Sequence, residues 1–361
     1  MKILFVITLA ELGGAQSVVI NLANTACERG HEVYVASSEE GKMWEMLHEN
    51  VIRVPIKALE RNINKKDFRV LYILRKLYKS IKPDVVHLHS SKIGVLGRLA
   101  FPSRKVIYTV HGFDSIRLAF RKFLPVERML QNRNKFIVGV SKYDVDGMLE
   151  EKITKNITYI YNGISDWPSL KIHSADKNAE EFFKDAKEKN NFIVLSIARL
   201  SPQKKFDLFC DVAREFEFSE GVKFVWIGNN YQPENLPENV HCLGELKNAF
   251  VYLKYADLFM LPSNYEGLPI SILEALSYGV PVIASDVGGV NEVLDGHNGF
   301  ALPNSVDAFA EKINDFLHGK LDIADYRKAA RQSYEKHFTV EKMYNEYKKL
   351  YNKIASDNSS N

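Results

Sequence analysis

The chain has 361 residues, 46% of them hydrophobic, which is enough for two domains that each bury a core. A formal net charge of +3 gives the chain no strong overall attraction for a polyanion, so we expect no nucleic-acid partner. The three cysteines, Cys27, Cys210 and Cys242, lack metal-binding or redox spacing, and such sparse thiols are typical of a reducing compartment. These features predict a cytoplasmic protein.

The N-terminal run ILFVITLA predicts a buried β-strand rather than a signal peptide. Only Lys2 precedes its apolar residues, and no small-residue cleavage site follows before Gly13. Similar runs follow at HEVYVAS, DVVHLHS, KVIYTVHG, KFIVGVS and ITYIYNG, with helical stretches between them. Because their apolarity is continuous, we expect these strands in a parallel sheet that is covered on both faces. Residues 1–165 are therefore predicted to form a doubly wound, Rossmann-like domain.

A second series of strands follows a polar segment at 166–190, which we predict to be a linker region. The apolar runs NFIVLSIA, KFVWIGN, VHCLG, LFMLPS, PVIASD and GFALP predict a second Rossmann-like domain over 191–339. A helix is predicted at 340–354 and is expected to dock back on the first domain, whereas 355–361 has nothing to bury and predicts a disordered tail. The fold class is α/β, with two doubly wound domains facing a central cleft at the carboxyl ends of their strands.

The segment LPSNYEGLPISILEALSYGVPVIASDVGG carries the most informative polar pattern of the chain. Pro269 predicts the first turn of a helix that ends before Gly279. Glu266 then lies in the loop before the helix, and Glu274 lies about a turn and a half into it. Backbone N–H groups at such a helix end bind a phosphate or a sugar hydroxyl, so two carboxylates are predicted beside an anion site. An amphipathic helix with one surface carboxylate gives the same spacing by chance.

With its flanking sequences, this segment resembles the E-x7-E motif of glycosyltransferase family 4, whose members are retaining glycosyltransferases of the GT-B type. The flanks LPS, GVPV and GGV also resemble that family. The resemblance implies that Glu274 binds the ribose hydroxyls of a nucleotide-sugar donor. It also implies that consecutive groups hold the donor sugar, namely Glu266, Gly267, Leu268, Pro269 and Ile270. We assign Leu243 and Gly244, which follow another strand, to the same donor site.

The loop SIARLSPQKKFD places Arg199 and Lys204 five residues apart across a proline-containing turn. It resembles the R-L-x-x-x-K-x-x-D element of the same family, which implies that both cations contact the donor diphosphate. Arginine offers a bidentate fork and lysine a point charge, and both stabilise negative charge on a leaving diphosphate. Two alternatives remain open: an ordinary basic loop, and a role for the adjacent Lys205 in place of Lys204.

The first domain supplies a glycine pair and a histidine after its strands. The loop TLAELGGAQ resembles the family's first-loop GGA element, so we expect the backbone at Gly14 to approach the donor closely; a plain tight turn is the alternative. This loop lacks the GxGxxG pattern, which argues against a dehydrogenase. His111 ends the strand KVIYTVHG, and the resemblance implies a position near the donor sugar. A lone histidine without that resemblance is more often structural.

The acceptor side is predicted from two further segments of the first domain. In DVVHLHSSKIG, His89 and Lys92 are expected to face the acceptor and His87 to face a helix layer. Residues 116–135 combine basic and apolar side chains, so they predict peripheral association with an anionic membrane surface on the inner face of the cell membrane. A solvated helix face is the alternative for that segment.

Neither a metal nor an organic cofactor is predicted. Asp144 and Asp146 match the letters of a D-x-D metal motif, but Ser141 followed three residues later by Asp144 predicts a capping box that opens a helix. The chain also lacks a lysine motif that resembles the pyridoxal phosphate site of phosphorylases.

Together these features predict a retaining hexosyltransferase. We expect it to move a hexose-type sugar from a nucleotide-diphosphate sugar to a saccharide or lipid-linked saccharide in bacterial surface-polysaccharide assembly. A UDP-sugar is the first donor that we would test. The catalytic set comprises His111, Arg199, Lys204 and Glu266. We predict no enzymic nucleophile, and the donor phosphate takes the acceptor proton. The alternatives are a GT-B-fold nucleotide-sugar epimerase or hydrolase, and a non-catalytic sugar-nucleotide-binding partner in a glycosyltransferase complex.

Overall fold

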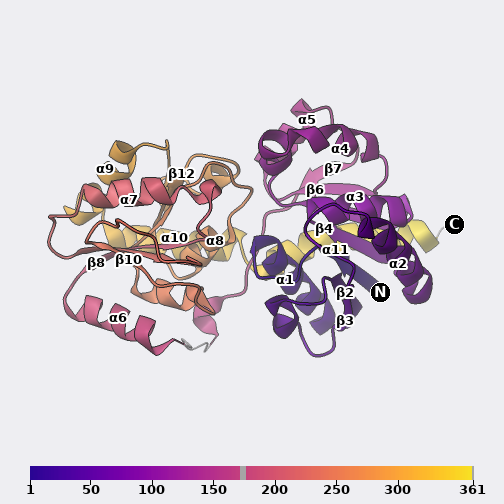
Figure 1. The fold of residues 1–361 in the computed structure, drawn as a ribbon, viewed down its shortest axis with the longest axis horizontal. Helices are drawn as coiled ribbons and strands as arrows, with labels where there is room; N and C mark the ends of the chain where they lie inside the picture. Colours follow the sequence, from indigo (N-terminus) through magenta and orange to yellow (C-terminus); the bar gives the residue numbers. More distant parts are fainter. Residues whose placement is uncertain (171–175, 360–361) are drawn as a thin grey trace. The chain divides into compact units, whose positions relative to one another are not determined.

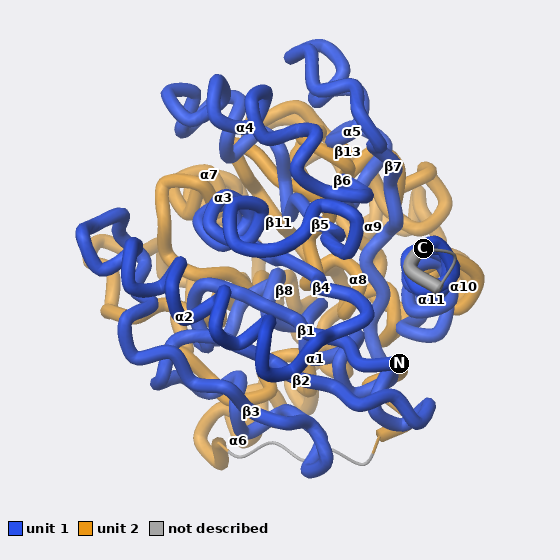
Figure 2. Tube along the Cα trace, turned by 90° about the vertical axis from the view of Figure 1, so that its right-hand side faces the viewer, with its two compact units in different colours: residues 1–165, 339–361 blue, residues 166–338 orange. Residues whose placement is uncertain are grey.

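A computed structural model describes residues 1–170 and 176–359, with side chains to Asp357. The chain divides into two compact units, coloured separately in Figure 2. Unit 1 comprises Met1–Ser165 together with the C-terminal segment that begins at Thr339, and unit 2 comprises Asp166–Phe338. The last helix of the sequence therefore belongs to the first unit.

Unit 1 is built on a seven-stranded sheet in which every pairing is parallel, in the order β3-β2-β1-β4-β5-β6-β7. Its strands are β1 (Lys2–Val6), β2 (Glu32–Ser37), β3 (Ile52–Pro55), β4 (Val85–His89), β5 (Val106–Val110), β6 (Phe136–Gly139) and β7 (Ile157–Tyr159). The strand order reverses between β1 and β4, and ligands of doubly wound sheets bind at the carboxyl ends of the strands at such a switch point.

Helices cover both faces of this sheet (Figure 1). The α-helices of unit 1 are α1 (Gly14–Glu28), α2 (Lys66–Ile81), α3 (Ser91–Ala100), α4 (Leu124–Leu130), α5 (Lys142–Glu150) and α11 (Val340–Ser359). On one face, Leu4 and Leu88 pack with Leu74 of α2 and Ile93 of α3 in a buried cluster. On the other face, His87 of β4 contacts α11. The alternation of side chains along each strand therefore feeds two separate core layers.

Unit 2 repeats this plan with six parallel strands in the order β10-β9-β8-β11-β12-β13. The strands are β8 (Phe192–Ile197), β9 (Val222–Ile227), β10 (Val240–Cys242), β11 (Leu258–Leu261), β12 (Val282–Ser285) and β13 (Gly299–Leu302). The helices are α6 (Lys177–Glu188), α7 (Phe206–Arg214), α8 (Ile270–Ser277), α9 (Val306–Leu317) and α10 (Ile323–His337). The predicted fold class, α/β with two doubly wound Rossmann-like domains, is confirmed.

Two boundaries differ from the sequence-based expectation. Residues 177–188, inside the predicted linker region 166–190, form α6, and its fully buried Phe183 stacks on Tyr252 and Tyr255. This helix is polar on average, which favoured a linker, although its buried Ala179, Phe183 and Ala186 recur at helical spacing. The predicted tail 355–361 is helical as far as Ser359 because α11 continues past its last buried residue, Ile354. Residues 171–175 and 360–361, which also fall in those predicted segments, lie outside the described residues.

Among the described residues, no helix combines the length and the apolar character needed to cross a bilayer.

Candidate active site

The polar residues predicted for the donor follow β8 and β11, the two neighbouring strands between which the order of the unit 2 sheet reverses. Arg199 and Lys204 follow β8, whereas Glu266 follows β11. The topology thus brings two loops to one edge of the sheet, where Lys204 contacts Glu266 although the two residues are 62 positions apart in sequence. Such a switch point is where ligands bind in open α/β sheets.

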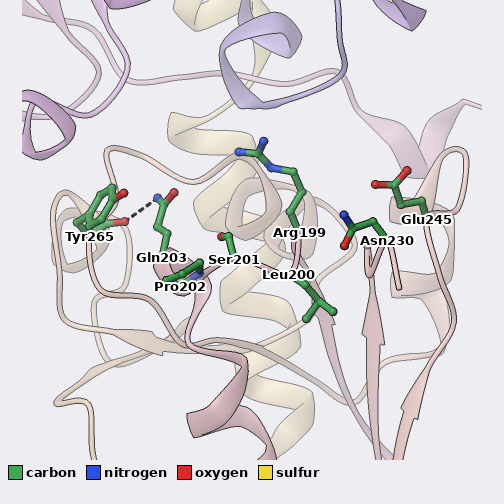
Figure 3. A pocket seen from close by; sticks show the side chains of 9 residues that line it. Arg199, Leu200, Ser201, Pro202, Gln203, Asn230, Glu245 and Tyr265 are labelled. Atoms are coloured by element: carbon green, nitrogen blue, oxygen red, sulfur yellow. Dashed lines mark hydrogen bonds between the residues drawn. The ribbon is translucent and has the colours of Figure 1, made fainter. Parts of the chain in front are cut away.

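The loop after β8 is fastened to the loop after β11 by three hydrogen bonds. The backbone N–H of Asn264 donates to the carbonyl of Gln203 at 2.8 Å, and its side-chain amide donates to the carbonyl of Pro202 at 2.7 Å. In return, the Gln203 amide donates to the carbonyl of Tyr265 at 2.9 Å (Figure 3). Lys205, which follows, has a left-handed backbone with φ of 38°. This clamp fixes the position from which Lys204 extends.

Lys204 and Glu266 form an ion pair inside this site. The Lys204 ammonium donates to Oε1 of Glu266, and the Ser263 hydroxyl donates to the same oxygen at 2.7 Å. Glu266 is only 7% exposed. Its other oxygen, Oε2, accepts no hydrogen bond from the described residues, which leaves an acceptor for a ligand hydroxyl.

A polar network at the ends of three strands holds Ser263 in place. The Ser263 N–H donates to the Ser285 hydroxyl at 2.7 Å, and that hydroxyl donates to Asn304 at 2.5 Å. The Asn304 amide donates back to the carbonyl of Ser263 at 2.9 Å. All three residues lie at the carboxyl ends of β11, β12 and β13. The orientation of Glu266 therefore depends, through Ser263, on Ser285 and Asn304, which belong to none of the motifs found in the sequence.

The helix that follows Glu266 is α8, which begins at Ile270 with Pro269 as its N-cap, one residue later than predicted. Pro269 has no N–H, so it offers a ligand no backbone donor. The N–H groups of Gly267 and Ile270 donate to no group in the described part of the chain. Gly288 passes so close that a Cβ there would lie 2.0 Å from the carbonyl oxygen of Glu266, so this packing requires glycine.

Glu274, in the middle of α8, is half-buried. Within residues 1–170 and 176–359 its carboxyl has neither an ion-pair nor a hydrogen-bond partner. Burial raises the pKa of Glu274 to about 8, because the low-dielectric surroundings disfavour the charged form. A desolvated carboxyl without a hydrogen-bond partner costs free energy, and a hydrogen bond from a ligand hydroxyl would offset that cost.

A cavity of about 390 Å³ opens beside the loop after β8. It is lined by Arg199, Leu200, Ser201, Pro202, Gln203, Gly228, Asn230, Glu245 and Tyr265 (Figure 3). Arg199 is exposed and makes no ion pair with any described residue. Glu245 and Asn230 were not predicted, because their polar letters in loops carry no recognisable spacing. The predicted Leu243 and Gly244 stand just before Glu245, and the Gly244 N–H donates to Asn229 at 2.7 Å.

In unit 1 the predicted loops also meet at a switch point, between β1 and β4. The Thr8 hydroxyl after β1 is 2.5 Å from the Ser90 hydroxyl after β4. Gly13 is the N-cap of α1, and Gly14 is the first residue of that helix. Gly13 has extended backbone with φ of 177°, so neither a left-handed turn nor strain explains the glycine there.

The unit 1 histidines lie together. His89 Nδ1 is 2.9 Å from His111 Nε2, and His111 is partly exposed whereas His89 is fully buried. His87 contacts Tyr351 of α11, so its predicted position against a helix layer is confirmed. Lys92 forms an ion pair with Asp67 at 2.6 Å and donates to the carbonyls of Glu60 and Asn62. Acceptor contacts of His89 and Lys92 stay predictions, and the structure gives both side chains other partners.

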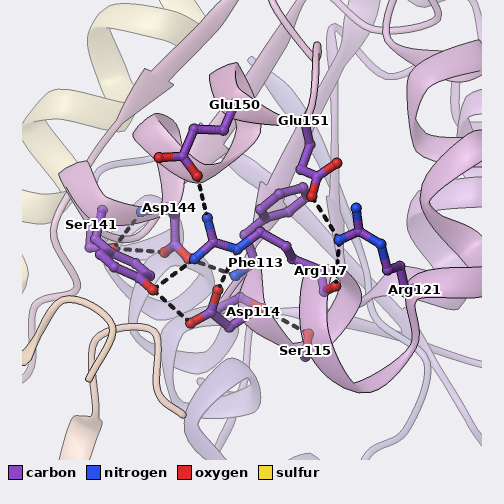
Figure 4. A network of polar contacts seen from close by, with 11 residues as sticks. Phe113, Asp114, Ser115, Arg117, Arg121, Ser141, Asp144, Glu150 and Glu151 are labelled. Carbon is purple, nitrogen blue, oxygen red and sulfur yellow. Dashed lines mark hydrogen bonds and ion pairs between the residues drawn. The ribbon is translucent and has the colours of Figure 1, made fainter.

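The helix start predicted at Ser141 and Asp144 is confirmed, with Ser141 as the N-cap of α5. The Asp144 N–H donates to the Ser141 hydroxyl at 3.1 Å, and that hydroxyl donates to the Asp144 carboxylate at 2.9 Å. The same carboxylate accepts from the Phe113 N–H at 2.6 Å, two residues after His111 (Figure 4). Asp144 therefore anchors the loop that follows β5.

Residues 116–135 do not form one amphipathic helix. They comprise the end of a π-helical turn (Ser115–Ala119), a 3-10 turn (Arg121–Phe123) and the short helix α4. Three of their arginines pair with acids. Arg117 pairs with Asp114 and Glu150, and Arg121 pairs with Glu151 (Figure 4). Arg128 also pairs with Glu151. Much of the basic charge expected to face a membrane is thus neutralised within unit 1.

Both units match families of known proteins. Residues 12–166 match the family model "Glycosyltransferase Family 4", and residues 177–334 match "Glycosyl transferases group 1". The Escherichia coli O-antigen biosynthesis glycosyltransferase WbnH is 30% identical over 360 residues, covering 96% of this chain and 98% of that relative. The chain belongs to glycosyltransferase family 4.

Two further relatives of this family 4 glycosyltransferase are informative. An E. coli UDP-Gal:alpha-D-GlcNAc-diphosphoundecaprenol alpha-1,3-galactosyltransferase is 30% identical to this chain. The match covers 97% of this chain and 96% of the galactosyltransferase. The crystal structure of Anabaena HepE in complex with UDP-glucose has a TM-score of 0.80 at 21% identity and covers 100% of both chains. The second likeness shows a shared GT-B fold.

Proposed function

We propose that this glycosyltransferase moves a hexose from a UDP-sugar to a lipid-linked saccharide, with retention of anomeric configuration, in the assembly of a bacterial surface polysaccharide. The observation that carries the proposal is the Lys204–Glu266 ion pair at the switch point of unit 2, beside Arg199, which makes no ion pair with the described residues. A cation for a diphosphate and a carboxylate for sugar hydroxyls stand together there, as a nucleotide-sugar requires.

Each part of the donor has a matching group in unit 2. Arg199 and Lys204 meet the diphosphate, and Oε2 of Glu266 with the N–H groups of Gly267 and Ile270 meets the sugar hydroxyls. Glu274 accepts from the ribose. The name of the E. coli galactosyltransferase specifies a UDP-sugar donor and a diphosphoundecaprenol acceptor, and this supports the same classes here.

The transfer forms a bond from an acceptor hydroxyl oxygen to C1 of the sugar and breaks the bond from C1 to the phosphate oxygen. UDP leaves with the bonding electron pair, and its phosphate oxygen takes the proton of the acceptor hydroxyl. Arg199 and Lys204 stabilise the charge that grows on the diphosphate during this step. His111 of unit 1 contacts a hydroxyl of the donor sugar.

Association with the inner face of the cell membrane brings the enzyme to a lipid-linked acceptor. Since three of the four arginines of 116–135 pair with acids, the contact is expected to depend on three exposed apolar side chains, Leu118, Phe120 and Met129, which are 59%, 55% and 70% exposed. Cosedimentation with anionic vesicles tests this, and loss of binding in the triple serine variant is the expected result.

The function is tested with purified protein, UDP-glucose or UDP-galactose, and a synthetic diphospholipid-linked N-acetylhexosamine. We expect release of UDP that depends on the acceptor, and a product whose new linkage has the donor's anomeric configuration by NMR. Sugar released as the free hexose without acceptor use indicates a hydrolase. A nucleotide-sugar of altered configuration indicates an epimerase, and tight UDP binding with no turnover indicates a non-catalytic partner.

A further inference from the structure

Three histidines form a row in unit 1, from the C-terminal helix to the end of β5. His87 is fully buried, and both its ring nitrogens have partners. Its Nδ1 is 2.9 Å from the Tyr351 hydroxyl of α11, and its Nε2 is 2.7 Å from the Thr109 hydroxyl. The ring of His87 lies 4.1 Å from the ring of His89, centroid to centroid. This end of the row is a satisfied structural core.

His89, the middle member, has one hydrogen-bonding partner among the described residues, whereas His87 has two. Its side chain is fully buried, and its Nδ1 is 2.9 Å from Nε2 of His111. Its Nε2 is buried and has no hydrogen-bond partner in the part of the chain that the structure describes. Buried polar atoms nearly always have a hydrogen-bond partner, so an unpartnered ring nitrogen calls for an explanation. Here the ring orientation is set by the bond that the other nitrogen makes to His111.

The hydrogen bond between His89 and His111 ties their protonation together. A neutral imidazole carries one N–H, so one ring donates the shared proton and the other accepts it. If His89 carried its proton on Nε2, it would bury an N–H with no acceptor, and such orphaned N–H groups are rarer than unpaired acceptors. The better assignment puts the His89 proton on Nδ1, where it is donated to Nε2 of His111.

We propose that His89 is a positioning residue that holds His111 as its Nδ1–H tautomer, so that His111 meets the donor sugar as a neutral hydrogen-bond donor. The part that concerns the sugar rests on the function proposed above. With Nε2 of His111 occupied by His89, Nδ1 is the ring nitrogen left for a ligand, and it has no partner among the described residues.

The electrostatic setting agrees with a neutral row. The titratable groups around His89 are the two other histidines, with Tyr347 and Tyr351 of α11 next to His87. Burial lowers the pKa of His111 to about 4 and the pKa values of His87 and His89 well below their usual range. All three rings are therefore neutral at pH 7, and His111 offers an N–H rather than a charge.

The tautomer is measured first, without any substrate, by long-range proton–nitrogen NMR on protein labelled with ¹⁵N-histidine. The chain has ten histidines, and His111→Gln assigns the relevant pair of signals. We expect Nδ1 of His111 to be the protonated nitrogen in the unmodified protein. Protonation at Nε2 would overturn the proposal, and this outcome is independent of whether the enzyme has the proposed function.

Three variants then test the cause. His89→Phe keeps a buried ring without a donor and should shift His111 toward the Nε2–H form, whereas His89→Asn keeps an amide near the position of Nδ1 and should restore the native tautomer. His87→Phe is the matched control: it should lower thermal stability by removing the bonds to Tyr351 and Thr109 but leave the His111 tautomer unchanged. An equal change of the His111 tautomer in His87→Phe and His89→Phe would show that His89 acts only through packing in the core, and the proposal would be wrong.

Kinetics with the UDP-sugar test the functional part. We expect kcat/KM for the donor to fall about tenfold in His89→Phe, the size of one neutral hydrogen bond, and to recover to within about threefold in His89→Asn. If His89→Phe changes the tautomer but leaves kcat/KM unaltered, the donor contact of His111 is wrong. If no variant or unmodified protein turns over the donor, the proposed function fails while the NMR result still stands on its own.

Discussion

Lys204 and Glu266 of unit 2 neutralise each other at the position where a donor is expected to bind. The pair leaves one ammonium face and one carboxylate oxygen for a ligand, because Ser263 and Lys204 both use the same oxygen of Glu266. Each charge thereby holds the other in place before a donor arrives, which is the kind of preorganisation that favours a charged transition state. Removing one partner leaves the other buried and uncompensated.

Lys204→Ala is expected to lower kcat about 100-fold or more. The charge on the leaving diphosphate grows in the transition state, and removing one group that stabilises such a charge costs roughly 3 kcal/mol. Steady-state kinetics with the true donor measures the effect, with Lys205→Ala as the neighbouring control. Near-normal kcat with merely weaker donor binding would remove Lys204 from its assigned role, and Lys205 would then be the residue to examine.

Glu274→Ala is expected to act on donor affinity rather than on kcat. The ribose hydroxyls do not change during the reaction, so a contact with them contributes equally to the ground state and the transition state. Loss of the hydrogen bond that this carboxyl accepts, which leaves a ribose hydroxyl without its partner, raises KM for the donor by about 10-fold to 100-fold. A variant whose kcat falls while its KM stays unchanged would place Glu274 at the reacting atoms instead.

Glu274→Gln should change how stability depends on pH. The pKa of this carboxyl is raised by burial from 4.5 to about 8, so its contribution to stability is full below about pH 4.5 and is lost as the pH rises towards 8. Glutamine cannot ionise. We therefore expect the variant to match the parent in Tm near pH 5 and to exceed it by about 2 °C or more at pH 8.5. A difference that is constant from pH 5 to 8.5 speaks against the raised pKa.

Chelation should leave activity intact. Arg199 and Lys204 are expected to meet the donor diphosphate without a divalent ion. UDP release is compared with and without excess EDTA, after the protein has been passed through a chelating resin. Activity that disappears and is restored by Mg²⁺ or Mn²⁺ would show that the metal-independent assignment is wrong.

Glu127→Ala is expected to destabilise unit 1. Glu127 of α4 accepts from Arg98 of α3 at 2.6 Å, both side chains are buried, and the Arg98 guanidinium lies 4.5 Å from the centre of the Tyr108 ring. Removing one partner of a buried pair costs about 3–5 kcal/mol. Urea denaturation measures the loss. The exposed pair partner Glu346 gives the control, since Glu346→Ala is expected to change stability by no more than about 1 kcal/mol.

The sequence was sufficient for the sheets and for the main donor residues because both depend on local pattern. Each apolar run that predicted a strand corresponds to a strand of the structure. The missed strand is β3, whose residues IRVP are mostly exposed and end in proline, so neither continuous nor alternating apolarity marks it. Arg199 and Glu266 stood out only through a family resemblance that spacing alone does not supply.

What the sequence could not reveal are contacts between distant residues. Nothing in the letters around Ser263 pairs it with Asn304, and nothing around Arg117 announces Glu150 as its partner. Likewise, the sequence around His89 and His111 does not show that His89 is buried or that the two side chains share a hydrogen bond. These relationships arise from sheet register and helix packing, which bring together side chains that no short motif contains.

The place of α11 also determines the order in which the protein can be completed during synthesis. His87 and its partner Tyr351 are 264 residues apart, so at about 5–20 residues per second the ribosome takes roughly 13–50 seconds to supply the hydroxyl that this buried imidazole needs. Unit 2 is finished at Phe338, before α11 exists. Unit 1 is therefore completed only after all residues of unit 2 have been made, and until α11 is added the buried His87 lacks the partner of its Nδ1.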